Sequence, residues 1–206
     1  MDYPVTVTID PPSGERNRLT TAFRIILAIP HLFLVGGLGV SLLSRNGLAF
    51  TGEGGVLGAV AGVLAIVSWF TIVLGGPHIA GIREFTRFFL RWRVRAIAYV
   101  MLLEDRYPPF GDGPYPTTLD VVDPALPRDR VSVGFRLLLG IPHFIVLFFI
   151  AVIWCFTSFV GWLSILVSGS YPKPLYDFSV GVLRWHIRVE AYMFLLVDAY
   201  PPFSFD

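Results

Sequence analysis

Long apolar stretches alternate with charged stretches along this chain, and they predict helices that enter a membrane. Residues 19–43 are mostly apolar and are interrupted by Arg24, Pro30 and His31, and residues 55–76 contain no charged residue. A transmembrane helix needs about 20 mostly apolar residues. We therefore predict one membrane helix in each of these two segments.

The third apolar stretch, residues 131–168, is too long for a single membrane helix. Its only titratable residues are Arg136, His143 and Cys155. A straight helix of this length measures about 57 Å, whereas the hydrocarbon core of a bilayer is about 30 Å thick. We therefore predict a tight helical hairpin here, with its turn within residues 149–158.

Two further segments, 79–104 and 176–197, combine arginine with aromatic residues and predict amphipathic helices. The arginines that follow one another at regular spacing are Arg83, Arg87, Arg91 and Arg95 in the first segment, and Arg184 and Arg188 in the second. Four residues advance about 400° around a helix, so each set forms one stripe. Such a stripe is typical of a helix in the headgroup plane, where it binds anionic phospholipids. The alternative is a solvated stripe that pairs with acidic residues.

The chain also contains an internal duplication. Ile29-Pro30-His31 recurs as Ile141-Pro142-His143 at an offset of 112 residues, whereas Arg91-Trp92 recurs as Arg184-Trp185 at an offset of 93. The difference of 19 residues indicates an insertion in the first copy, within the Gly-rich segment 36–55. Repeats of this kind define the organisation of a fold. We predict two units, residues 1–114 and 115–206.

Each unit has the same order of predicted elements. A short β-prone lead (residues 5–9 and 117–122) precedes a helical hairpin, an amphipathic helix and a Tyr-Pro-Pro-Phe segment, whose prolines should end that helix. The predicted fold class is an all-α membrane protein with four transmembrane helices in two tandem hairpins. An even number of crossings per unit gives both copies the same orientation, so their pseudo-twofold axis should lie along the membrane normal.

Composition narrows the class of protein further. Hydrophobic residues make up 54% of the chain and charged residues 15%, which excludes a soluble monomer and a disordered chain. One cysteine excludes a disulfide framework and a thiolate zinc site. The net charge of +1 does not indicate a nucleic-acid partner.

The distribution of basic residues predicts which side faces the cytoplasm. The loop between the first two predicted helices, residues 44–54, has Arg45 as its only basic residue. Most other basic residues fall on the side of the two termini. The positive-inside rule makes that side cytoplasmic. The first 18 residues have no apolar run, so we expect no secretory signal peptide.

Arg24 and Arg136 lie about one turn inside predicted membrane helices. Near a helix end, a long arginine side chain can reach the interface, where it contacts a headgroup phosphate or an acidic residue of the amphipathic helix. Glu84 and Asp177 occupy equivalent positions and are the expected acidic partners. The alternative is an intramembrane site for an anion or a lipid.

His31 and His143 lie two turns further along, and each follows a proline. A proline frees a carbonyl of the preceding turn, and an imidazole N–H could satisfy it. The alternative uses the duplication: two histidines on helices related by a twofold axis could face each other and ligate a haem or chlorin, or relay protons. No other cofactor or metal site is predicted.

The recurring segments Phe-Arg-x4-Ile-Pro-His, Arg-Trp-x2-Arg-x2-Ala-Tyr and Asp-x-Tyr-Pro-Pro-Phe resemble an uncharacterised bacterial integral-membrane family, the DUF4389 type. The resemblance covers nearly the whole chain, in both copies. It implies a bacterial cytoplasmic membrane protein and brings no activity or catalytic residue with it. The copies depart from each other at residues 36–55 and at His186, which replaces Arg93.

No common catalytic motif is present, so we do not expect an enzyme. The leading hypothesis is a non-catalytic structural or accessory subunit of a membrane complex, or a homo-oligomer. Its expected partners are the bilayer, anionic phospholipids, and a membrane protein or a second copy. The alternatives are an anionic-lipid-binding or transport protein that uses the arginines, and a haem or pigment carrier that uses His31 and His143.

Overall fold

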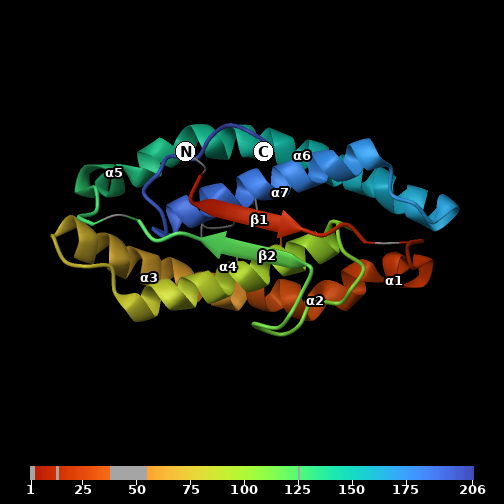
Figure 1. Ribbon diagram of the computed structural model, residues 1–206, viewed down its shortest axis with the longest axis horizontal. Helices are drawn as coiled ribbons and strands as arrows, with labels where there is room; N and C mark the ends of the chain where they lie inside the picture. Colours follow the sequence, from red (N-terminus) through yellow and green to blue (C-terminus); the bar gives the residue numbers. More distant parts are fainter. Residues whose placement is uncertain (1–2, 13, 38–54, 125) are drawn as a thin grey trace, which may run out of the picture.

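The computed structural model describes residues 3–12, 14–37, 55–124 and 126–206, which form a mostly helical fold with one small sheet (Figure 1). The elements of the first repeat are β1 (Val5–Ile9), α1 (Arg18–Ala22), α2 (Arg24–Val35), α3 (Gly55–Val73) and α4 (Ala80–Val100). Those of the second are β2 (Thr117–Val121), α5 (Arg130–Gly134), α6 (Arg136–Ser168) and α7 (Lys173–Met193). The predicted β-prone leads are confirmed as strands.

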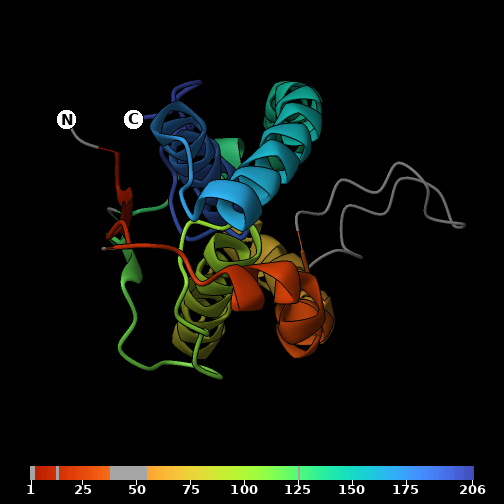
Figure 2. The same cartoon turned by 90° about the vertical axis from the view of Figure 1, so that its right-hand side faces the viewer.

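The molecule is a slab of three layers (Figure 2). The two strands form one outer layer, α4 and α7 form the middle layer, and α2, α3 and α6 form the other outer layer. The strands alternate buried and exposed residues, because one face of the sheet packs on α4 and α7 while the other faces outward. The main core surrounds the middle helices and includes residues of the strands and of α2, α3 and α6.

The strands pair across the twofold axis of the duplication. β1 and β2 are antiparallel, and Val7 pairs with Leu119, its own equivalent at the offset of 112. A pair of equivalent residues facing each other fixes the pseudo-twofold axis at that point, perpendicular to the sheet. The axis therefore runs along the short dimension of the slab, and both repeats present their apolar helices on the same side (Figure 1).

The predicted hairpin in residues 131–168 is wrong, because α6 is a single helix of 33 residues. The segment proposed for the turn, 149–158, contains neither glycine nor proline, so nothing in it interrupts the helical hydrogen bonds. The helix ends instead at Gly169, whose left-handed backbone (φ 74°) caps it. The prediction of two hairpins, and with it of four crossings, therefore fails in the second repeat.

In the first repeat, α2 and α3 meet end to end. A Cβ added to Gly55, the first residue of α3, would lie 2.6 Å from backbone atoms of Phe33 and Leu34 in the last turn of α2. By the two offsets, α2 corresponds to residues 136–147 and α3 to residues 148–166, so the pair corresponds to the continuous α6. Most of the insertion, including Arg45 and the predicted loop 44–54, lies outside the described residues.

The amphipathic helices end earlier than predicted. α4 ends at Val100 and α7 at Met193, well before the Pro-Pro pairs. The chain leaves each helix through a leucine with a left-handed backbone, Leu102 (φ 65°) and Leu195 (φ 63°). This conformation costs an L-residue about 1–2 kcal/mol, and an arginine from the segment before α1 or α5 holds each leucine carbonyl. These arginines, and not the prolines, contact the chain where each helix ends.

The repeats also exchange contacts at both ends of the slab. α1 packs on α6, and α5 packs on α3. Trp162 of α6 donates its indole N–H to the carbonyl of Thr21 at 3.0 Å, and the equivalent Trp69 donates to the carbonyl of Val133 at 2.9 Å. The two repeats therefore fold around each other rather than as separate bodies.

Candidate membrane face and motif clusters

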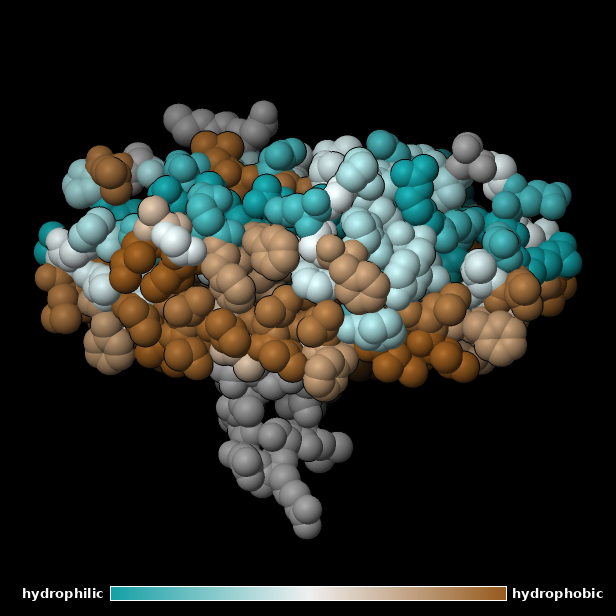
Figure 3. All heavy atoms as spheres, turned by 90° about the horizontal axis from the view of Figure 1, so that it is seen from below, coloured by the Kyte–Doolittle hydropathy of each residue, from teal (hydrophilic) through white to brown (hydrophobic). Residues whose placement is uncertain are grey.

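One broad face of the slab is apolar, and the opposite half is polar (Figure 3). The helices of the apolar layer expose large hydrophobic side chains along their whole length. Representative exposed residues are Ile25, Ile29 and Phe33 of α2, Val63, Ile66 and Phe70 of α3, and Leu138, Phe149, Phe156 and Val167 of α6. An exposed apolar patch of this extent marks a surface that contacts lipid or another protein.

Among the described residues, two helices are long and apolar enough to cross a membrane, α3 and α6. Only 22% of the most apolar window of each is buried inside the protein. Most residues of each window are therefore at least partly exposed on the surface. α2, which carries the first predicted membrane helix, has only 12 residues.

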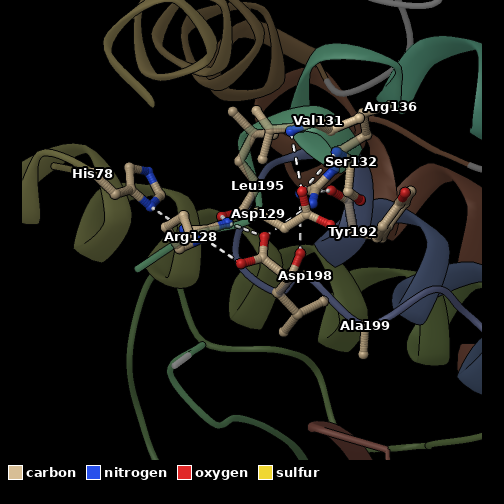
Figure 4. Close-up of polar contacts among 12 residues, drawn as sticks. His78, Arg128, Asp129, Val131, Ser132, Arg136, Tyr192, Leu195, Asp198 and Ala199 are labelled. Carbon is tan, nitrogen blue, oxygen red and sulfur yellow. Dashed lines mark hydrogen bonds and ion pairs between the residues drawn. The ribbon is translucent and has the colours of Figure 1, made fainter. Parts of the chain in front are cut away.

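Arg24 and Arg136 are each buried in a polar cluster of their own repeat, and each is 1% exposed. Arg136 donates to the carbonyls of Tyr192 and Val197 at 3.0 Å and to Asp198 Oδ1 at 3.0 Å (Figure 4). Arg128 joins the same carboxylate through two bonds of 2.6 Å. The cluster thus neutralises one carboxylate with two guanidinium groups.

The first repeat contains the equivalent cluster. Arg24 donates to Asp105 Oδ1 at 2.7 Å and to the carbonyls of Tyr99 and Glu104, and Arg16 lies 3.1 Å from the same oxygen. The predicted acidic partners were therefore wrong. Glu84 forms ion pairs with Arg83 and Arg87 instead, and Asp177 pairs with Lys173.

His31 and His143 each lie in an aromatic pocket within their own repeat, and both are fully buried. Trp92 donates its indole N–H to His31 Nδ1 at 2.9 Å, and Phe110 stacks on the same ring. Trp185 and Phe203 make the same contacts with His143. Because an indole nitrogen can only donate, Nδ1 must accept, which fixes the neutral imidazole with its proton on Nε2.

This arrangement differs from both sequence-based interpretations of the histidines. Nδ1 of each ring accepts a hydrogen bond from tryptophan, and Nε2, which holds the proton, donates to no carbonyl freed by proline among the described residues. The ring contacts of each histidine are with its own repeat, and they do not bring the two imidazoles together. Each imidazole is therefore enclosed by aromatic side chains of its own repeat.

The three recurring motifs meet in these clusters. The Phe-Arg-x4-Ile-Pro-His segment supplies the arginine and the histidine, Arg-Trp supplies the indole, and Asp-x-Tyr-Pro-Pro-Phe supplies the carboxylate and the stacking ring. Sequence reasoning missed the tryptophan–histidine bond. The signal was available, because Trp92 and Trp185 recur with the histidines in both copies.

The arginine stripes of α4 and α7 face the strands and the polar side of the slab. Arg83 and Arg87 contact Asp123, Arg91 and Arg95 lie near Asp112, and Arg184 and Arg188 donate to the carbonyls of Val7 and Ser204. Val7 lies in β1 and Asp123 follows β2, so these contacts are on the strand side of the middle layer. The geometry therefore favours the alternative of a stripe paired within the protein.

The copies diverge at one charged cluster between α4 and α7. Arg93 contacts both carboxylate oxygens of Glu190 at 2.8 and 3.0 Å, and His186 Nε2 lies 3.2 Å from Glu190 Oε1. At the offset of 93, His186 is the equivalent of Arg93 and Glu190 is the equivalent of Ile97. Since Arg93 also donates to the carbonyl of Val35 at 2.5 Å, this cluster ties the end of α2 to both middle helices.

Glu104 is a second departure from the symmetry, because its equivalent is Val197. The side chain is buried, and Oε1 has no hydrogen-bond partner among the described residues. Burial raises the pKa of Glu104 to about 7, although Arg16 acts in the opposite direction. Ionisation of this group therefore opposes folding.

We predict that Glu104→Gln stabilises the protein at pH 8 and not at pH 4.5. The wild type loses stability as pH rises from the unfolded pKa near 4.5 to the folded value of about 7. The variant should be more stable by about 2 kcal/mol at pH 8. Denaturant unfolding in mild detergent at both pH values measures this difference. An equal difference at both values would contradict it.

No group of three or more metal-ligating side chains occurs among the described residues. The polar clusters of the two repeats are internal and mostly satisfied by their own chain. The described surface has a large apolar face, and this face is the candidate functional site.

The class defined by these observations is a duplicated helical protein with one large apolar face. The chain belongs to the DUF4389 family, a domain of unknown function, whose model matches residues 48–111 and 130–204. There is one match in each repeat, which confirms the resemblance drawn from the motifs. A search of curated proteins and a search of solved structures each find no match.

Proposed function

We propose that this protein is a non-catalytic membrane protein that lies in the plane of the bilayer, with α2, α3 and α6 embedded in one leaflet. In this arrangement it does not cross the membrane as a four-helix, multi-pass protein. It serves as a structural or accessory component on the cytoplasmic face of a bacterial membrane. The observation that carries the proposal is the segregation of apolar side chains onto one face of the slab.

The length of α6 supports an in-plane position. Its exposed apolar residues run from Leu137 to Val167, which corresponds to a rise of about 45 Å. The hydrocarbon core is about 30 Å thick, so spanning would require a tilt of roughly 50°, outside the usual range of membrane helices. A helix lying in one leaflet has no such limit.

The neighbours of α6 also support an in-plane position. α7 packs along α6, and the strands pack on α7 and α4, with charged residues on the polar side. If α6 stood along the membrane normal, those charges would enter the hydrocarbon beside it, where each costs several kcal/mol. With the slab in the plane, the pseudo-twofold axis lies along the membrane normal, and both repeats sit at the same depth.

A depth measurement tests the proposal. Cysteine is placed at Leu138, Val152 or Val167, which are exposed on one side of α6, in a Cys155→Ser background. Nitroxide labels at these sites are compared for accessibility to oxygen and to a water-soluble relaxation agent in reconstituted vesicles. In-plane attachment predicts equal depths. A spanning helix with the tilt of roughly 50° would separate neighbouring labels by about 14 Å in depth.

Two outcomes would overturn the proposal. The first is a middle label that lies deep while the end labels lie at the headgroups. The second is a set of labels that contact no lipid, because the apolar faces of two copies cover each other. A monomer–dimer measurement in detergent identifies the second case.

A further inference from the structure

Two equivalent arginines stand apart from the predicted lipid-binding stripe. Arg18 begins α1 and Arg130 begins α5, at opposite ends of the slab. Both are exposed, and neither has an acidic partner among the described residues. By contrast, the arginines of the stripe contact carboxylates or carbonyls of the chain.

Each arginine is placed at the edge of the apolar face. The next residue, Leu19 or Val131, is apolar and is 70% exposed. The guanidinium of Arg18 lies over Gly169, where an added Cβ would meet its nitrogens at 3.4 and 3.5 Å. Arg130 lies over Gly75 in the same way, at the end of α3. Both charges therefore sit at the boundary between polar and apolar halves.

A tryptophan from the other repeat accompanies each arginine. Trp162 anchors α1 through the carbonyl of Thr21, and Trp69 anchors α5 through the carbonyl of Val133. Both indoles are only partly buried. Tryptophan concentrates at the headgroup level of a bilayer, and arginine binds phosphate through its planar fork of donors.

We propose that Arg18 and Arg130 are a pair of binding sites for the phosphate groups of anionic phospholipids, one at each end of the embedded face. This inference rests on the proposed in-plane attachment. The two sites, placed symmetrically about the axis, hold both ends of the slab at headgroup level. They replace the stripe of α4 and α7 as the place where the protein recognises lipid charge.

The test compares the binding of the full chain to neutral phosphatidylcholine vesicles and to vesicles with 30% phosphatidylglycerol. Arg18→Gln/Arg130→Gln should lose about 30-fold of the preference for anionic vesicles, about 5-fold for each arginine. Binding to neutral vesicles should stay unchanged. Arg91→Gln/Arg184→Gln, an equivalent pair with the same loss of charge on the polar side, is the control and should retain the preference.

The outcomes separate this inference from the proposed function. If the wild type does not bind neutral vesicles, the proposed in-plane attachment is itself wrong. An equal loss of preference in both double variants would show that net charge sets the preference for anionic vesicles, and that Arg18 and Arg130 are not specific binding sites. Inorganic phosphate at constant ionic strength should not compete, and full competition would show that the sites take free phosphate instead of lipid.

Discussion

Asp198→Asn is expected to destabilise the fold by about 3 kcal/mol at neutral pH, the cost of breaking a buried ion pair on one side. The substitution leaves Arg128 and Arg136 without their shared carboxylate, although their bonds to carbonyl oxygens remain. Both guanidinium groups are almost completely buried, so water cannot replace the lost partner. Denaturant unfolding followed by tryptophan fluorescence in mild detergent measures the loss.

The effect should depend on pH in a defined direction. Burial opposes ionisation of Asp198, but the hydrogen bonds and charges of Arg128 and Arg136 outweigh it and lower the pKa of the carboxyl below its ordinary value. The stabilisation is complete above the unfolded pKa near 4, and it is lost as pH falls through the lower folded value. The wild type and Asp198→Asn should therefore approach each other in strong acid.

Asp177→Asn is the matched control. Asp177 pairs with Lys173 on the surface, where an ion pair contributes at most about 1 kcal/mol. Asp105→Asn should behave like Asp198→Asn, since Arg16 and Arg24 share its carboxylate in the same way. A loss at Asp198 no larger than that at Asp177 would contradict the role assigned to the cluster.

Much of the local structure could be predicted from the sequence, because it depends on local patterns. Alternating Val and Thr residues predicted β1, and the duplication predicted that contacts made by the shared motifs of one repeat recur in the other. The matching bonds of Trp92 and Trp185 to histidine are an example. The pairing of β1 with β2 was not predictable in this way, because it joins residues more than 100 positions apart.

The predicted membrane topology was wrong because the length of an apolar segment alone does not decide how its helix lies in a bilayer. Residues 131–168 contain no helix breaker in the predicted turn, and α6 remains straight enough to pack along α7. The buried face of α6 contains Gly140, Leu147 and Gly161, which the residue composition did not distinguish from the exposed face. The acidic partners of Arg24 and Arg136 were likewise missed. Partners were expected within the amphipathic helices, whereas Asp105 and Asp198 lie just after them.

The second large effect concerns the apolar face. Phe149→Asp/Phe156→Asp should abolish vesicle binding. The two phenylalanines are seven residues apart, on one side of α6, and both are exposed. An aspartate costs about 3 kcal/mol at the centre of a bilayer and less near the headgroups, so two should reduce partitioning at least about 100-fold. Flotation with neutral vesicles measures this change, and circular dichroism checks that the helices remain.

Thr8→Asp/Val122→Asp supplies the control for charge. Thr8 lies on the outward side of β1, and Val122 follows β2 and is exposed on the polar side. This variant adds the same two charges, yet it should bind vesicles like the wild type, because those residues face water when the slab lies in the leaflet. If both variants lose binding equally, net charge and not the apolar face governs attachment. If neither loses it, α6 does not contact lipid.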